Sequence, residues 1–244
     1  MNEVIEERRE ATEALRKIPI SNPQERYDLE YCTPAEITAL TGISCKFLKG
    51  NTHYWYWSPG ATSRELECRV NRTHRVLDVG AGNGMLLRTL ISSPPMFVPR
   101  NQITGVDISE TSVKRLRELG VNAIHGTLAD VKGEYDRIFL SYFIDRDSDQ
   151  LGTIEKAVKL LSPKRGEIYL EGLFPCKLED SLGTSYGKAN VTKGNSRDED
   201  VELVIKAFEC FGATMEYTAH SNRYVYSLDG WERLSSTTIC FKRM

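Results

Sequence analysis

The sequence has no apolar run that approaches the roughly 18 residues that a membrane helix needs. It also lacks an excess of positive charge, because 32 lysines and arginines stand against 34 acids. Nothing in this balance draws the whole chain to nucleic acid or to an anionic membrane, although a local basic patch stays open. Internal repeats and low-complexity tracts are missing too. These absences argue against membrane-spanning, fibrous and disordered chains.

Cysteine pairing is a further absence. The six cysteines include no C-x-x-C pair, and no histidine stands at metal-ligand spacing from them. The first stretch, residues 1–17, is rich in Glu and Arg and lacks the apolar centre of a signal peptide. We therefore expect a soluble cytoplasmic protein whose cysteines are free thiols, mostly buried.

The chain is predicted to have two parts. Residues 1–74 hold an amphipathic segment to about Ile18, a capping box that begins at Thr33, and the aromatic run His53-Tyr54-Trp55-Tyr56-Trp57. We expect these residues to form an N-terminal helical cap or lid. Residues 75–244 then form one larger domain.

The larger domain alternates strand-like and helix-like patterns. Short apolar stretches typical of buried strands occupy residues 76–79, 103–106, 121–124, 137–140 and 167–170. Helical spacing occupies residues 85–91, 109–119, 151–161 and 199–211, and two last strands fall within 213–226 and 237–241. This alternation predicts an α/β fold with a parallel sheet covered by helices on both faces.

The most informative segment is the turn after the first strand, where three glycines alternate at positions 80, 82 and 84. Glycines allow positive φ angles and close approach of a ligand to the backbone, and the following helix offers free N–H groups. The rhythm is G-x-G-x-G, unlike the G-x-G-x-x-G of dinucleotide sites.

Two acids accompany this turn. Asp78 lies inside the first strand, where a carboxylate suits a cationic amino group better than a pyrophosphate. Asp107 ends the second strand, where an acid can accept two hydrogen bonds from a ribose diol. Together they describe a nucleoside that carries a positively charged amino acid.

The segment Asp78–Gly84, followed by Val106-Asp107, resembles the class I S-adenosylmethionine-dependent methyltransferases. The resemblance implies a doubly wound sheet of seven strands, mostly parallel with an antiparallel last strand, and S-adenosyl-L-methionine as the cofactor. Many members have an acid where this chain has Thr127, which departs from the pattern at the adenine. The implied cofactor-binding residues are Asp78, Gly80, Ala81, Gly82, Asn83, Gly84, Asp107, Ile108, Thr127, Leu128 and Ser141.

Methyl transfer depends mainly on positioning and on exclusion of water, although a hydroxyl acceptor also needs a base. In this fold the acceptor lies beyond the carboxyl ends of the strands. The candidate catalytic residues are Tyr142, His53 and Asp145. The candidate substrate-binding residues are Tyr54, Trp55, Trp57, Phe143 and Glu171.

A metal is not expected. Asp145, Asp147 and Asp149 suggest one, but catechol-type members carry an acid and an Asp-Asn pair where this chain has Ser141 and Glu171. We expect one of the three aspartates to cap the next helix instead.

The leading hypothesis is a methyltransferase that acts on oxygen or nitrogen of a small molecule, without nucleic acid or membrane as partner. The sequence Ser141-Tyr142-Phe143-Ile144 stands where enzymes of DNA bases and protein glutamine carry Asn/Asp-Pro-Pro-Tyr, which disfavours those targets. Two alternatives stay open: a regulatory member of the fold that binds the cofactor without catalysis, and a methyltransferase of tRNA or protein.

Overall fold

The computed structural model describes residues 69–141 except 93 and 95, then 149–172, 198–227 and 230–244, with isolated residues near the N-terminus. Much of the expected N-terminal cap and the polar stretch 177–197 lie outside this part. So do seven candidate residues, which therefore stay predictions: His53, Tyr54, Trp55, Trp57, Tyr142, Phe143 and Asp145.

The core of the molecule is a seven-stranded sheet with the order β3-β2-β1-β4-β5-β7-β6. Strands β1 to β5 are parallel, and β7 runs antiparallel to both β5 and β6. This confirms the mostly parallel sheet with an antiparallel last strand. The strands are β1 Val76–Val79, β2 Ile103–Asp107, β3 Asn122–His125, β4 Arg137–Ser141, β5 Glu167–Gly172, β6 Ala213–Ser227 and β7 Gly230–Arg243.

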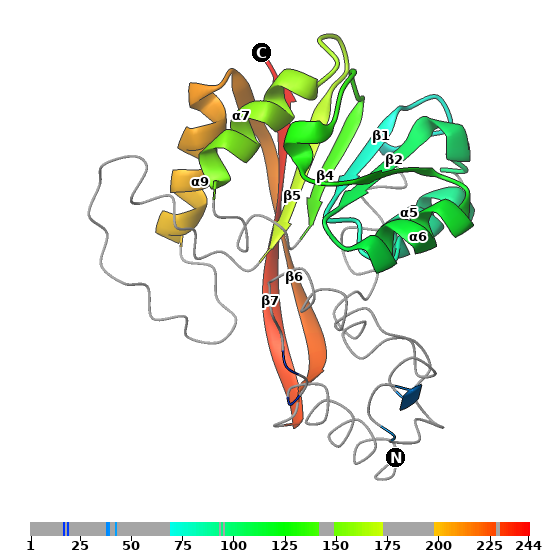
Figure 1. The fold of residues 1–244 in the computed structure, drawn as a ribbon. Coiled ribbons are helices and arrows are strands. Elements are labelled where there is room, and N and C mark those ends of the chain that lie inside the picture. Colours follow the sequence, from blue (N-terminus) through cyan, green and yellow to red (C-terminus); the bar gives the residue numbers. More distant parts are fainter. Residues whose placement is uncertain are drawn as a thin grey trace.

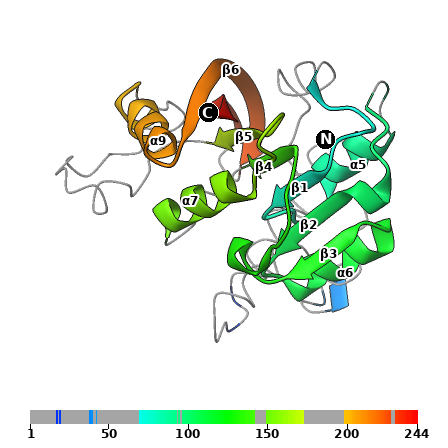
Figure 2. The ribbon, with the colours of Figure 1, turned by 90° about the horizontal axis from the view of Figure 1, so that it is seen from above.

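Helices cover both faces of the sheet, as the alternating pattern predicts. Helices α5 and α6 lie on one face, and α7 and α9 lie on the other (Figures 1 and 2). Their bounds are α5 Met85–Ser92, α6 Glu110–Leu119, α7 Gln150–Leu160 and α9 Asp198–Cys210, with short 3-10 turns η1 Arg100–Gln102 and η2 Leu128–Asp130.

Successive residues of the central strands feed two separate cores. In β4, Ile138 and Leu140 pack in the cluster with α7 and α9, whereas Phe139 packs in the cluster with α5 and α6. In β5, Leu170 and Tyr169 divide in the same way. Successive side chains of a strand point to opposite faces of the sheet, and helices cover both faces here. Both sets of side chains are therefore buried, which explains why these strands are continuous apolar runs in the sequence.

The helix ends follow their sequence signals. Ser109 caps α6 by accepting the N–H of Ser112, and Gly120 ends it in the left-handed conformation with φ 82°. Asp149 caps α7 by accepting the N–H of Gly152 at 3.0 Å. The expectation that one aspartate of the loop caps this helix is confirmed.

The last strand is longer than predicted. The sequence places the final strand at residues 237–241, but β7 begins at Gly230 and pairs with β6 over its whole length. The pairing with β5 stops at Gly172 and Thr237, so the rest forms a two-stranded ribbon that projects past the carboxyl end of β5 (Figure 1). Backbone hydrogen bonds between the two strands hold the ribbon. Its sequence mixes polar residues with large apolar or aromatic ones such as Tyr224, Tyr226 and Trp231.

The structure also bears on membrane-spanning helices and on the cysteines. Among the described helices, none has the length and apolar character needed to cross a membrane. Cys240 is buried and Cys210 is exposed, both as free thiols.

Candidate cofactor site

The turn between β1 and α5 has the geometry that its glycines allow. Gly80, Gly82 and Gly84 have φ angles of 70°, 54° and 76°, which L-residues rarely adopt. A Cβ atom built on Gly84 would lie 2.9 Å from Leu116 Cδ2, so α6 packs directly on this turn. The glycines therefore serve both the backbone shape and the close packing of the two helices.

Asp107 ties the end of β2 to this turn. Its carboxylate accepts the backbone N–H of Gly82 at 2.8 Å and the N–H of Ser109 at 2.8 Å, and the side chain is buried. The carbonyl of Val106 accepts the N–H groups of Gly80 and Ala81 at 2.9 and 3.1 Å. Because a carboxylate can accept about four hydrogen bonds, these contacts are compatible with a further pair from a ribose diol.

Asp78 is a buried acid on the face of the sheet that α5 and α6 cover. Only 4% of the residue is exposed. Burial and the negative charge of Asp107 raise the pKa of Asp78 to about 8. A ligand with a cationic group would offset both causes, whereas an anion would add to them. The position therefore fits an ammonium group.

The loops after β2 and β3 are joined to each other. His125 Nε2 lies 3.0 Å from the carbonyl oxygen of Ile108, to which it donates. Thr127 and Asp130 form a capping box on η2, and Leu128 is buried beneath it. The Thr127 side chain therefore caps η2 at the position where the family pattern has an acid.

Ser141 and Glu171 lie side by side at the carboxyl ends of β4 and β5. They are register partners, and Glu171 is also the partner of Thr238 in β7. Ser141 is half-buried and Glu171 is 1% exposed. The structure thus places both predicted residues at the same edge of the sheet as the glycine turn. The turn follows β1, whereas these residues end β4 and β5.

Charge is distributed unevenly along this edge. The described residues at the carboxyl ends of β1 to β5, together with the starts of α6 and α7, include six acids and no lysine or arginine. These acids are Asp78, Asp107, Glu110, Asp130, Asp149 and Glu171. The ribbon beyond β5 adds Arg223, Glu232 and Arg233. The raised pKa of Asp78 leaves that acid mostly protonated near pH 7, so the other five acids give this edge its negative charge in a chain that is nearly neutral overall.

One group of described side chains, Glu167, Glu216 and Cys240, comes close enough together for a metal ion. The Arg69 guanidinium already lies 2.7 Å from Glu216 and 3.8 Å from Glu167. Burial raises the pKa of Cys240 to about 12, so the thiol stays protonated. Glu167 begins β5, Glu216 lies in β6 and Cys240 lies in β7 opposite Tyr169, so the group is near the amino end of β5, away from the glycine turn.

No model of a known protein family matches the chain. Its structure is similar to that of a proposed RNA methyltransferase from Pyrococcus horikoshii, with 15% identity, a TM-score of 0.55 and coverage of 97% of this chain and 98% of that one. It is also similar to M. jannaschii TYW2 in complex with AdoMet, with 17% identity, a TM-score of 0.50 and 78% of each chain covered. Magnesium protoporphyrin IX methyltransferase from Synechocystis PCC 6803 with bound SAH has 16% identity, a TM-score of 0.50 and coverage of 75% and 82%.

The strand order, the helices on both faces and these similarities define the fold as that of the class I S-adenosylmethionine-dependent methyltransferases. The glycine turn after β1 and the acid at the end of β2 stand where the sequence motifs place them.

Sequence reasoning missed the opposite, amino edge of the sheet. Asp136 there accepts the N–H of Arg75 at 2.9 Å and pairs with Arg165 at 2.8 Å. The three residues are up to 90 positions apart in the sequence, so no local motif signals the cluster. The basic residues that precede successive strands were the only available hint.

Proposed function

We propose that this chain is an S-adenosyl-L-methionine-dependent methyltransferase. The observation that carries the proposal is the pair of acids at the glycine turn. Asp78 is buried where a cationic amino group would be favourable, and Asp107 ends β2 where the family binds the ribose. The glycine turn with three positive φ angles lets the methionine part approach the backbone.

In this proposal the bound cofactor supplies an activated methyl group on sulfur. Asp78 pairs with the ammonium, and Asp107 accepts the ribose hydroxyls while it holds Gly82 in place. The loops at Ile108 and Thr127 border the adenine. Ser141 lies beside the cofactor at the end of β4, and the residues that follow it exclude water from the transfer.

We further propose that the acceptor is a small molecule that is neutral or cationic. The negative charge at the carboxyl ends of β1 to β5 supports this, because a phosphate backbone would meet five ionised acids there, against Arg223 and Arg233 in the described ribbon beyond β5. Glu171, buried beside Ser141, is the described acid best placed to orient a donor group of the acceptor. The cytoplasm stays our prediction for where the protein works.

The test is a methyl-transfer assay that measures formation of S-adenosylhomocysteine. Three acceptor pools are compared: small amines, small phenols and alcohols, and bulk tRNA. We expect turnover with one of the small-molecule pools and none with tRNA. Turnover with tRNA alone would contradict the proposed acceptor while leaving the methyltransferase assignment in place.

A variant pair tests the role of Glu171. We expect Glu171→Gln to lower turnover at least tenfold with unchanged affinity for the cofactor, because the acid is proposed to act on the acceptor. Glu209→Gln, which removes the same charge from an exposed position at the end of α9, is the matched control and should keep full activity. Equal activity of both variants would remove Glu171 from the site.

A further inference from the structure

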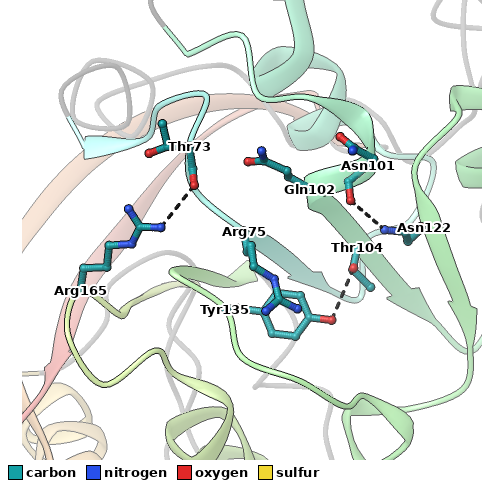
Figure 3. Close-up of a pocket in the computed structure, with 8 residues that line it drawn as sticks. All are labelled: Thr73, Arg75, Asn101, Gln102, Thr104, Asn122, Tyr135 and Arg165. Carbon is teal, nitrogen blue, oxygen red and sulfur yellow. Dashed lines mark hydrogen bonds between the residues drawn. The ribbon is translucent and has the colours of Figure 1, made fainter.

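A cavity lies at the edge of the sheet opposite the glycine turn. Its volume is about 360 Å³, and its residues precede or begin β1 to β4, with one from the turn before β5 (Figure 3). It is lined by Thr73, Arg75, Asn101, Gln102, Thr104, Asn122, Tyr135 and Arg165. Cavities of roughly 300–1,000 Å³ are the size that binds small organic ligands.

The lining is cationic. It includes two arginines, three amides and three hydroxyl groups but no carboxylate. Arg165 is held in place by Asp136, at 2.8 and 3.1 Å, and by the carbonyl of Thr73 at 3.3 Å. Arg75 makes no ion pair with any described acid, and its guanidinium lies over the Tyr135 ring, 5.5 Å from the centroid. An anion would give Arg75 the partner that the described protein does not supply.

The segments around the cavity also carry net positive charge. The segments 69–75, 98–103, 120–122, 131–137 and 161–167, which lead into β1 to β5, hold eight lysines and arginines against three acids. Two of those acids, Asp136 and Glu167, already contact arginines. The amino edge therefore attracts anions, in contrast to the carboxyl edge that carries the cofactor site.

Several hydrogen bonds preform the cavity. Tyr135 donates to Thr104 at 3.4 Å, which fixes the ring under Arg75. Asn122 donates to the carbonyl of Asn101 at 3.3 Å, which joins the starts of β2 and β3. Figure 3 shows Arg165 and Asn122 at opposite ends of the cavity with Arg75 between them. The shape thus belongs to the fold and is present before any ligand arrives.

We propose that this cavity binds the phosphate group of a nucleotide-sized ligand. The Arg75 guanidinium matches phosphate oxygens in charge and in fork geometry. Arg165, whose Nε and Nη2 pair with Asp136, offers its remaining N–H groups as further donors. The amides and hydroxyls along the rest of the lining offer donors and acceptors to a sugar or a base. The site is separate from the methyl-transfer site and does not depend on the assignment of a cofactor to that site.

The test is calorimetric titration with ATP, in the absence and presence of saturating S-adenosylhomocysteine. We expect the wild type to bind ATP equally in both conditions. Arg75→Gln should weaken binding at least fivefold, because it removes the guanidinium that forms no ion pair with a described acid. Its backbone hydrogen bonds to Asp136 stay available, so the fold should be retained. Arg88→Gln, at an exposed position of α5 outside the cavity, is the matched control.

A second variant and a second probe complete the test. Asn122→Asp places a carboxylate in the cavity and should also weaken ATP binding at least fivefold. A ten-nucleotide RNA without terminal phosphates is titrated in parallel. Three results would overturn the proposal: no binding of ATP, loss of ATP binding when S-adenosylhomocysteine is added, or binding of the RNA alone with the same dependence on Arg75.

Discussion

The Asp107 carboxylate accepts the backbone N–H of Gly82 at 2.8 Å and so joins the end of β2 to the turn after β1. One acid thereby shapes the loop that is proposed to hold the methionine part while it lies where the ribose is expected. If the proposed site is right, loop geometry and cofactor recognition are coupled through this side chain. A change at Asp107 should affect both.

Asp78 should make the ligand-free protein less stable as the pH rises. Its folded-state pKa is about 8, raised from 3.8 by burial and by Asp107. Between these values the folded state binds more protons than the unfolded state, so the free energy of unfolding falls from about pH 4 to about pH 8 and then levels. Asp78→Asn should abolish this contribution and raise the melting temperature at pH 8. A variant less stable than the wild type at pH 8 would contradict the account.

The same acid should release a proton when the cofactor binds. At pH 7 most of the ligand-free protein carries a protonated Asp78, and pairing with an ammonium favours the carboxylate. Titrations with S-adenosylmethionine in buffers of different ionisation enthalpy should show release of close to one proton per site. Asp78→Asn should lose both the proton release and most of the affinity. Heats that do not vary with the buffer would remove Asp78 from the site.

Gly84 should tolerate no side chain. Gly84→Ala places a Cβ at positive φ and 2.9 Å from Leu116 Cδ2. Gly212→Ala is the matched control, because its φ is 85° but no atom lies within 4 Å of its Cβ position. We expect about 1–2 kcal/mol of destabilisation from backbone strain in both, and about 1–3 kcal/mol more in Gly84→Ala from overpacking. Equal losses in chemical denaturation would show that the packing against α6 is easily relieved.

Asp136 should protect the fold against acid. Burial alone would raise the pKa of Asp136, but the N–H of Arg75 and the Arg165 guanidinium lower it below its ordinary value. Its contribution is therefore complete above the unfolded-state pKa and is lost as the pH falls through the folded-state value. Asp136→Asn should cost about 1–3 kcal/mol at pH 7 and flatten the acid limb of the stability curve.

A surface ion pair serves as the control for that experiment. Glu155 and Lys159 form an exposed pair one turn apart on α7. Glu155→Gln should change the free energy of unfolding by less than about 0.5 kcal/mol. A loss of unfolding free energy of similar size in both variants would show that the buried contacts of Asp136 stabilise the fold no more than an exposed ion pair does.

The features that the sequence predicts well are those with local causes. The period of the apolar residues locates β1, β2 and β4 within a residue of their ends, and Ser109 and Asp149 cap helices as their types suggest. The glycine turn carries its own signal, because only glycine fits three alternating positive φ angles.

Features built from distant residues escape such reasoning. The ribbon of β6 and β7 depends on pairing between its two strands. Residues 230–236 show no alternation of apolar and polar residues that would predict a strand there. The cavity at the amino edge collects residues from Thr73 to Arg165. Its positive charge is hidden in the nearly neutral total, because an acidic edge lies at the other end of the strands.

The most direct test of the methyltransferase assignment is calorimetric titration of the purified protein with S-adenosylmethionine, repeated on Asp107→Ala. Glu118→Ala, which removes an exposed acid from α6, is the control. We predict micromolar binding by the wild type and the control, weakened roughly tenfold or more by Asp107→Ala, about 1.4 kcal/mol. Equal binding by Asp107→Ala would contradict the site. So would an absence of binding in wild type from which mass spectrometry recovers no S-adenosylhomocysteine.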